Sequence, residues 1–286
     1  MKGVILAAGY GTRFLPGTKT IPKEMFPLVD TPVIDLIVKE MVDANINDIL
    51  IVTSRRKKVL EDYFDREVEL EETFLREGAH PKLDLIQPHQ ANVFFLRQHH
   101  MKGTGNALMQ VEPFVGKSPF VVAYPDDVVV GASLSRQLIE VYEKTGTTVL
   151  ACQHIPEGDI SRYGVVATEM RDGVEYATGM VEKPPPGTEP SRLVGFGRYL
   201  YTPDLFDALR RTHPPADHED EFTQTDAIND LASRGRVAVR RIEGHLLDVG
   251  TPLGFLEASV EYGLMREEIR EPFLKFLREV LNQQGG

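Results

Sequence analysis

Short apolar runs alternate with amphipathic segments through the first half of the chain. Runs of about 4–8 apolar residues bounded by turn residues are typical of buried β-strands. We expect such strands at Gly3–Ala8, Asp48–Thr53, Leu83–Gln87, Phe120–Tyr124 and Thr147–Gln153.

Helical patterns separate these expected strands. Thr31 is a suitable N-cap with Pro32 at the first helical position, and Ser133 is a suitable N-cap for a later helix. Apolar residues then recur every three or four positions, at Ile34, Ile37, Val38 and Met41, and again at Leu134, Leu138, Val141 and Tyr142. Strands and helices that alternate in this way indicate an α/β fold with a mostly parallel sheet flanked by helices.

The pattern changes after about residue 155. Expected strands at Tyr163–Glu169, Val174–Val181 and Leu193–Tyr201 follow one another without long helices between them, which indicates an inserted antiparallel section. Helical patterns return at Pro203–Arg211, Thr223–Ser233, Pro252–Met265 and Glu267–Leu281. Because no linker is long enough to separate independent units, we predict a single domain over residues 1–286 with a helical C-terminal tail.

Composition and charge exclude several classes of protein. The 286 residues are 42% hydrophobic and 26% charged, which is ordinary globular usage. The net charge of −11 argues against nucleic acid as a partner. No uncharged apolar stretch approaches the roughly 18–20 residues of a membrane helix, so we expect no membrane association. The single cysteine, Cys152, rules out an internal disulfide framework, and we expect a buried thiol in a cytoplasmic protein.

The first expected strand runs into G-Y-G-T-R-F, a glycine-rich loop at residues 9–14. A dinucleotide-binding loop is excluded because Phe14 occupies the third glycine position and prolines follow where a helix would have to start. A phosphate loop with adjacent Gly-Lys is excluded as well. The loop also carries Arg13, Lys19 and Lys23. In an acidic protein this local cluster of cations suits a polyphosphate ligand.

The same loop opens a longer match to a known family. Residues 9–30 read G-Y-G-T-R-F-L-P-G-T-K-T-I-P-K-E-M-F-P-L-V-D, which resembles the signature of the sugar-1-phosphate nucleotidyltransferases, and in particular that of their uridylyltransferases. Further matching motifs are R-Q-x-x-x-K-G-T-G-N-A (97–107), Y-P-D-D (124–127), Y-G-V-V (163–166), V-E-K-P (181–184), D-V-G-T-P-L-G-F (248–255) and V-E-Y-G (260–263). The resemblance implies a Rossmann-like nucleotidyltransferase fold, with a nucleotide-binding part at about 1–150 and a sugar-binding part with the helical tail at about 151–286.

Acidic residues follow two of the apolar runs, and hard oxygen ligands of this kind suit Mg²⁺. Asp126 and Asp127 come directly after Phe120–Tyr124, and Asp248 closes a later run. The resemblance makes Asp126 and Asp248 a pair of ligands for Mg²⁺. The sequence leaves open whether Asp126 or Asp127 is the inner ligand.

The resemblance also assigns nucleotide-binding positions. Arg13 and Lys23 fall on the positions that bind the triphosphate and stabilise charge during the reaction. Gln98 falls on the position that reads the uracil edge. An amide suits this role because it both donates and accepts hydrogen bonds. The remaining nucleotide-binding positions implied by the resemblance are Ala8, Gly9, Gly11, Thr12 and Gly103.

The sugar-phosphate side is assigned in the same way. Glu182 would accept hydrogen bonds from glucose hydroxyls, Lys183 would pair with the sugar phosphate, and Gly164 would leave room for the hexose. His99 and His100 are adjacent and have no His or Cys partner at metal-ligand spacing, so we interpret them as loop residues.

We therefore expect an enzyme that makes UDP-glucose and pyrophosphate from UTP and glucose 1-phosphate. One alternative is the same chemistry with another nucleotide, such as dTTP, or another sugar 1-phosphate. Another alternative is a catalytically silent protein that binds nucleotide sugars. The helical tail and the family likeness also lead us to expect a homo-oligomer.

Overall fold

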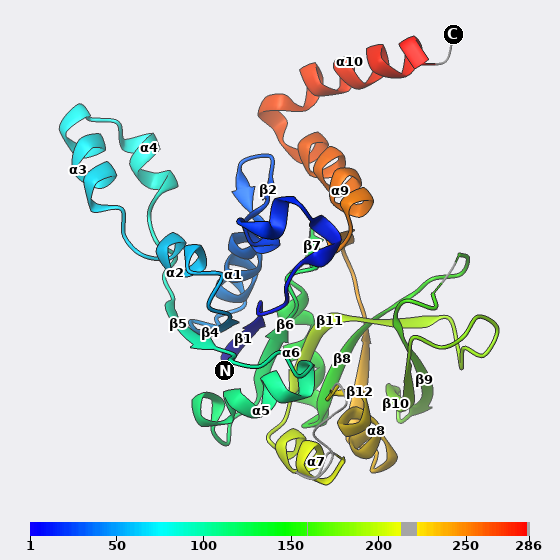
Figure 1. Ribbon diagram of the computed structural model, residues 1–286. Helices are drawn as coiled ribbons and strands as arrows, with labels where there is room; N and C mark the ends of the chain where they lie inside the picture. Colours follow the sequence, from blue (N-terminus) through cyan, green and yellow to red (C-terminus); the bar gives the residue numbers. More distant parts are fainter. Residues whose placement is uncertain (159, 213–221, 285–286) are drawn as a thin grey trace.

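The computed structural model describes residues 1–158, 160–212 and 222–284. The strands of its main sheet are β1 (Lys2–Leu6), β4 (Asp48–Thr53), β5 (Asn92–Arg97), β6 (Phe120–Ala123), β8 (Thr148–His154), β9 (Gly164–Arg171), β10 (Val174–Glu182), β11 (Leu193–Tyr201) and β12 (Val237–Arg241). Within the described residues they form one sheet in the order β5-β4-β1-β6-β11-β8-β12-β10-β9 (Figure 1). The sheet is mixed: β1, β4, β5 and β6 run parallel, whereas β11 runs antiparallel to both of its central neighbours.

Successive residues of the central strands point to opposite faces of the sheet, and helices cover both faces. In β1, Val4 packs in one hydrophobic core and the adjacent Ile5 packs in the other. The first core includes residues of α5 (Thr104–Val115), α7 (Asp204–Thr212) and α8 (Thr225–Ser233), and the second includes residues of α1 (Val33–Asp43) and α6 (Leu134–Thr145). The predicted α/β fold with an antiparallel section is confirmed.

A short antiparallel ribbon stands at the carboxyl end of β6. It pairs β7 (Asp127–Val130) with β13 (His245–Asp248), and its register sets Asp248 opposite Asp127. The backbone N–H of Val249 also donates to the carbonyl of Asp126 at 2.8 Å. The ribbon therefore brings two acidic segments of distant sequence together.

The loop after β1 folds as three 3₁₀ turns, at Thr12–Phe14, Gly17–Lys19 and Lys23–Met25. Its aromatic side chains anchor it, because the rings of Phe14, Phe26 and Phe255 pack edge to face with centroids 5.5–6.0 Å apart. Phe255 belongs to α9 (Pro252–Met265), so the loop is packed against the C-terminal part of the chain.

Two helical pairs extend away from the sheet (Figure 1). One consists of α3 (Val68–Glu77) and α4 (His80–Leu85), which follow the short α2 (Val59–Tyr63). The other consists of α9 and α10 (Glu267–Gln284), so the predicted helical tail is confirmed. Among the described residues, no helix has the length and apolar character that crossing a membrane requires.

Two predictions of local structure are wrong. The run Leu83–Gln87 is not a strand, because α4 occupies His80–Leu85 and carries Pro81 in its first turn; the strand beside β4 is Asn92–Arg97 instead. Thr31 does not cap α1, because Thr31–Pro32 is a short strand paired with Pro27–Leu28. The other predicted strands and helices are present with ends shifted by a few residues, and Ser133 caps α6 as expected.

Candidate functional site

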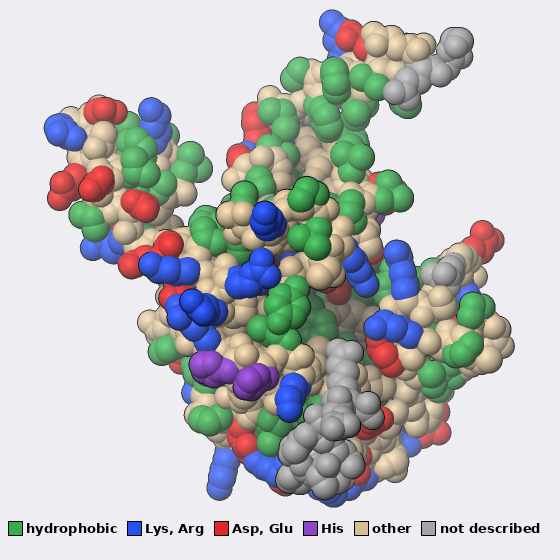
Figure 2. All heavy atoms as spheres, in the orientation of Figure 1, with side chains coloured by type: hydrophobic (Ala, Val, Ile, Leu, Met, Phe, Trp, Pro, Cys, Tyr) green, Lys and Arg blue, Asp and Glu red, His purple; other side chains and the backbone are tan. Residues whose placement is uncertain are grey.

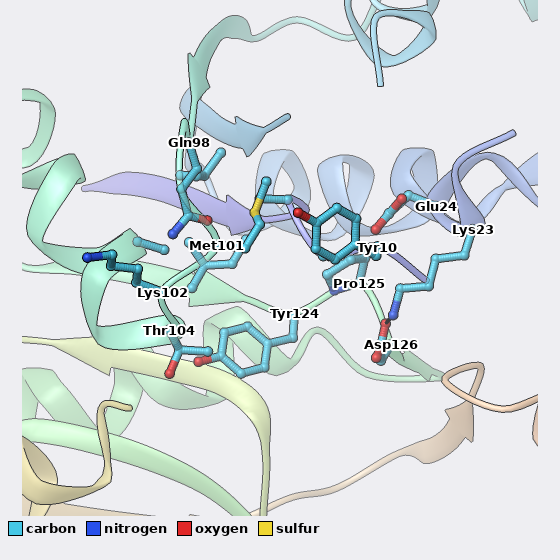
Figure 3. A pocket seen from close by; sticks show the side chains of 16 residues that line it. Tyr10, Lys23, Glu24, Gln98, Met101, Lys102, Thr104, Tyr124, Pro125 and Asp126 are labelled. Carbon is cyan, nitrogen blue, oxygen red and sulfur yellow. Dashed lines mark hydrogen bonds and ion pairs between the residues drawn. The ribbon is translucent and has the colours of Figure 1, made fainter. Parts of the chain in front are cut away.

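Two cavities adjoin at the carboxyl ends of β1 and β6, the edge where open α/β sheets bind ligands. The larger has a volume of about 680 Å³ and the smaller about 350 Å³. Thr104, Tyr124 and Asp126 line both of them. Figure 3 shows the larger cavity, with Gln98 and Lys102 at one end, Lys23 and Asp126 at the other, and Tyr10 between them. A single elongated ligand, or two ligands placed end to end, would fit this arrangement.

The end of the larger cavity farthest from Asp126 carries the side chains of Gln98 and Lys102 (Figure 3). Ala8 and Gly9, which follow β1, also line the larger cavity, and a side-chain carbon built on Gly9 would meet nothing within 4 Å. The buried Gln98 side chain lines it as well, and its amide nitrogen donates to the Asn106 side-chain oxygen at 3.1 Å. Gly103 begins α5 with a φ of 91°, a conformation that favours glycine. These predicted residues therefore surround one space large enough for a flat heterocycle.

Lys23 and Asp126 form an ion pair at the other end of this cavity, and Figure 3 shows the ammonium directed at the carboxylate. Lys23 comes from the third 3₁₀ turn of the first loop, and Asp126 follows β6. Their side chains are only 18% and 36% exposed. The pair places one cation and one anion side by side where the two cavities meet.

Asp248 lies next to Asp126 in the smaller cavity. A Cβ built on Gly250 would lie 3.2 Å from Asp248 Oδ1 and 3.3 Å from Asp126 Oδ2, so both carboxylates border the same small space. Mg²⁺ in phosphate-binding sites typically takes one or two carboxylates from the protein and completes its shell with phosphate oxygens and water. The described residues hold no group of three or more His, Cys, Asp or Glu that could form a closed metal site. Asp126 and Asp248 fit an open Mg²⁺ site in both number and chemistry.

Asp127 also lines the smaller cavity, but its carboxylate is bonded to the backbone of β11. Its Oδ2 accepts a hydrogen bond of 2.8 Å from the backbone N–H of Gly197 in β11. Burial, helped by the neighbouring carboxylates of Asp126 and Asp248 and opposed by the Gly197 hydrogen bond, raises the pKa of Asp127 to about 6. Because one oxygen of Asp127 is already bonded to Gly197, Asp126 has the freer carboxylate of the two for a metal ion.

The predicted sugar-phosphate residues line the smaller cavity. Gly164 begins β9, Glu182 ends β10, and Lys183 follows it with a φ of 47°. The Lys183 ammonium lies 3.7 Å from Glu182 Oε1. A Cβ on Gly164 would lie 2.0 Å from Met180 Cε and 3.1 Å from Glu182 Oε2, so a larger residue here would require the Met180 side chain to move. One carboxylate and one ammonium thus lie side by side on the wall opposite the larger cavity.

Three predicted residues of the first loop lie apart from the larger cavity. Arg13 lines the smaller cavity, where its Nη1 donates to the Gly250 carbonyl at 3.4 Å. Gly11 and Thr12 line neither cavity: the Gly11 carbonyl accepts from the Thr18 hydroxyl at 2.7 Å, and Thr12 is exposed. Gly11 therefore shapes the loop through its left-handed backbone, with a φ of 66°.

Sequence reasoning missed several residues of the site. Arg162 lies 3.6 Å from Asp248 Oδ2 and stacks over the ring of Tyr163. Tyr124 separates the two cavities, and its buried hydroxyl faces Thr104 and Gln224 without the geometry of a hydrogen bond to either. A lone Arg before a strand and a Tyr at a strand end carry no pattern, and only the neighbouring motifs could have pointed to them.

Comparison with known proteins gives a consistent result. A family model described as nucleotidyl transferase matches residues 2–263. The UTP–glucose-1-phosphate uridylyltransferase of Staphylococcus epidermidis is 41% identical over 286 residues, with 98% of each chain covered. A UTP-bound UGPase from Acinetobacter baumannii superposes with a TM-score of 0.86 at 34% identity, covering 97% of this chain and 98% of that chain. A UDP-glucose pyrophosphorylase complexed with UDP-glucose gives a TM-score of 0.80 at 37% identity, covering 93% of this chain and 99% of that one.

Proposed function

The chain belongs to the nucleotidyl transferase family, and we propose that it transfers a uridylyl group from UTP to glucose 1-phosphate, giving UDP-glucose and pyrophosphate. The observation that carries this proposal is the pair of adjoining cavities that meet at Asp126, one with a polar amide beside backbone groups and the other with a carboxylate beside an ammonium. Relatives of nearly full-length similarity carry this activity in their names, and solved neighbours are described with UTP or UDP-glucose bound.

In this proposal the larger cavity holds the uridine. The Gln98 amide can donate to a carbonyl of uracil and accept from its N–H, while Gly9 and Gly103 leave room for the base and ribose. The triphosphate would then extend toward Lys23 and Arg13, whose charges stabilise the α-phosphate and the departing pyrophosphate.

We also propose Mg²⁺ held by Asp126 and Asp248, because carboxylates are the hard oxygen ligands that Mg²⁺ takes beside phosphates. When bound, the ion supplies neutralisation of the triphosphate charge. The two carboxylates border one space beside Gly250, at the point that the triphosphate of a nucleotide in the larger cavity would reach.

The smaller cavity would hold glucose 1-phosphate. Glu182 accepts hydrogen bonds from hexose hydroxyls, and Lys183 pairs with the phosphate and holds its oxygen toward the α-phosphate of UTP. That oxygen attacks the α-phosphorus in line, the bond to the β-phosphate breaks, and pyrophosphate leaves. The described chain needs no covalent nucleophile for this reaction, because positioning and charge stabilisation supply the catalysis.

The test is release of pyrophosphate from UTP that depends on glucose 1-phosphate, with the other product identified by mass as UDP-glucose. Pyrophosphate with glucose 1-phosphate omitted would indicate hydrolysis instead. Binding of UDP-glucose without turnover in either direction would indicate the catalytically silent alternative.

We also propose a homo-oligomer held by α10. None of its described side chains is buried, although the exposed Phe276 and Leu281 belong to an apolar stripe along it, and Figure 2 shows hydrophobic side chains along this extension. Glu271 and Arg278 stand two turns apart, so antiparallel pairing of two copies would set each Glu271 against the partner's Arg278. Sedimentation equilibrium of the full chain tests this proposal.

For the location we propose the cytoplasm, because the one thiol, Cys152, is buried and has no disulfide partner.

A further inference from the structure

Lys57 carries a buried ammonium that no step of the proposed reaction uses. Its side chain is 6% exposed, and that of its partner Glu24 is 1% exposed. The ammonium donates to both oxygens of Glu24, at 2.7 and 2.8 Å, and to the carbonyl of Ala7 at 2.6 Å. All three of its donors are therefore used, which is the condition under which a buried charge is tolerated.

The two partners of Lys57 stand at the start and near the end of the first loop. Ala7 immediately precedes Ala8 and Gly9, which line the larger cavity. Glu24 follows Lys23, whose ammonium pairs with Asp126. One side chain thus connects the backbone that approaches the base with the turn that presents a cation to the triphosphate.

The segment that carries Lys57 holds the same loop at a second point. Arg56 Nη2 donates to the carbonyl of Lys19 at 3.1 Å, on the surface. Residues 54–57 form a turn, in which the N–H of Lys57 donates to the carbonyl of Ser54 at 3.0 Å. Because this segment follows β4 directly, it forms a fixed point of the sheet to which the loop is tied.

A buried ion pair is an expensive way to gain stability, because apolar residues of similar size would stabilise the fold as well or better. Burial lowers the pKa of Lys57, and the carboxylate of Glu24 opposes this effect. The hydrogen bonds of the Lys57 ammonium to its three acceptors are directional. They therefore set the distance between two parts of the loop, which non-directional apolar packing cannot do.

We propose that Lys57 is a positioning residue for the nucleotide half of the site: it fixes Ala8–Gly9 and Lys23 relative to one another, so that base and triphosphate are bound in register. The identity of the nucleotide rests on the proposed function. Glu24 itself lines the larger cavity, whereas the smaller cavity is lined by neither Ala7, Glu24 nor Lys57. Loss of Lys57 therefore weakens handling of UTP while sparing glucose 1-phosphate.

The test compares Lys57→Met with the double variant Glu24→Gln/Lys57→Met. The single variant leaves the Glu24 charge buried without a partner and lowers the thermal midpoint. The double variant removes both charges at nearly constant volume and recovers most of the midpoint. Lys58→Met is the matched control, because Lys58 is an exposed neighbour. The readouts are UTP binding by calorimetry, steady-state kinetics with each substrate varied, and amide hydrogen exchange of residues 8–25 in the free protein.

We expect the double variant to lose about 10²-fold in kcat/KM for UTP, the usual effect of a misplacement near 1 Å, with little change in the KM for glucose 1-phosphate. Exchange of residues 8–25 should rise, and Lys58→Met should match the wild type. A stable double variant with wild-type UTP kinetics and exchange would overturn the inference, and so would equal losses for both substrates. If the wild type bound no UTP, the proposed function would fail, whereas the exchange result would still decide whether Lys57 fixes the loop.

Discussion

Lys23 and Asp126, 103 positions apart in the chain, form an ion pair where the two cavities meet. An ammonium has three donors and a carboxylate has two oxygens, so each partner keeps capacity for a further ligand. Both groups thus stand ready to take a phosphate and a cation without any movement of the sheet.

Asp126→Asn and Asp248→Asn should each abolish most metal-dependent transfer, because an amide lacks the charge that holds Mg²⁺ beside a triphosphate. We expect a loss of at least about 10²-fold in kcat, with the thermal midpoint preserved. Pyrophosphate release titrated with Mg²⁺ measures this loss. Asp62→Asn, at an exposed position, is the control. Near-normal turnover in either variant would remove that residue from the metal site.

Lys183→Ala and Arg13→Ala should affect different substrates. Lys183 lies beside Glu182, so its loss should weaken productive binding of glucose 1-phosphate, whereas loss of Arg13, beside Gly250, should weaken use of UTP. Removing a positioned charge in an active site typically costs about 10²–10³ in rate. Steady-state kinetics with each substrate varied in turn, alongside UTP calorimetry, measures the split. If Lys183→Ala weakened UTP binding and spared glucose 1-phosphate, the division into two phosphate subsites would be wrong.

Arg198 and Glu40 form a buried ion pair behind the site, with side chains 0% and 8% exposed. The same Glu40 carboxylate accepts from the backbone N–H and the hydroxyl of Ser135, at 2.7 and 2.6 Å. Arg198→Met should therefore cost about 3–5 kcal/mol in the free energy of unfolding, because it strands a buried charge. Urea unfolding measures the cost. Arg234→Met, which removes an exposed pair with Asp230, should change it little.

The stability of the region around α1 should depend on pH. His89 Nε2 lies 2.7 Å from Asp35 Oδ1, and this bond raises the pKa of His89 above its ordinary value of about 6.5 against the effect of burial. Since the folded state holds the proton more tightly, the contribution is complete below about pH 6.5 and disappears as pH rises through the folded pKa. The difference in unfolding free energy between wild type and His89→Gln should thus be largest near pH 5.5. A difference that grew with pH would contradict this assignment.

Sequence patterns were sufficient to predict the buried central strands of the sheet but not its edge strand β5. Val4 and Ile5 are both fully buried because the strand is covered on both faces, and continuous apolar runs of that kind are easy to recognise. The edge strand Asn92–Arg97 has four apolar residues between polar ends and no fully buried side chain. The apolar run at Leu83–Gln87 that suggested a strand overlaps a short exposed helix.

In the candidate site, too, some residues could be predicted from the sequence and others could not. Motifs located Gln98, Glu182 and Lys183, which the fold places around two cavities. The burial of Asp127 against Gly197 depends on how β7 meets β11, and no local pattern encodes that contact. Lys57 was invisible for the same reason, because its two partners come from other parts of the chain.

The central claim is the identity of the two substrates, and a matrix of nucleoside triphosphates against sugar 1-phosphates tests it most directly. Initial rates of pyrophosphate release would be measured for UTP, dTTP, ATP and GTP, each with the 1-phosphates of glucose, galactose and N-acetylglucosamine. We predict the highest kcat/KM for UTP with glucose 1-phosphate, because the Gln98 amide complements the edge of uracil, and Glu182 and Lys183 complement the hydroxyls and the phosphate of the sugar. A higher kcat/KM for dTTP, or for another sugar phosphate, would contradict the account.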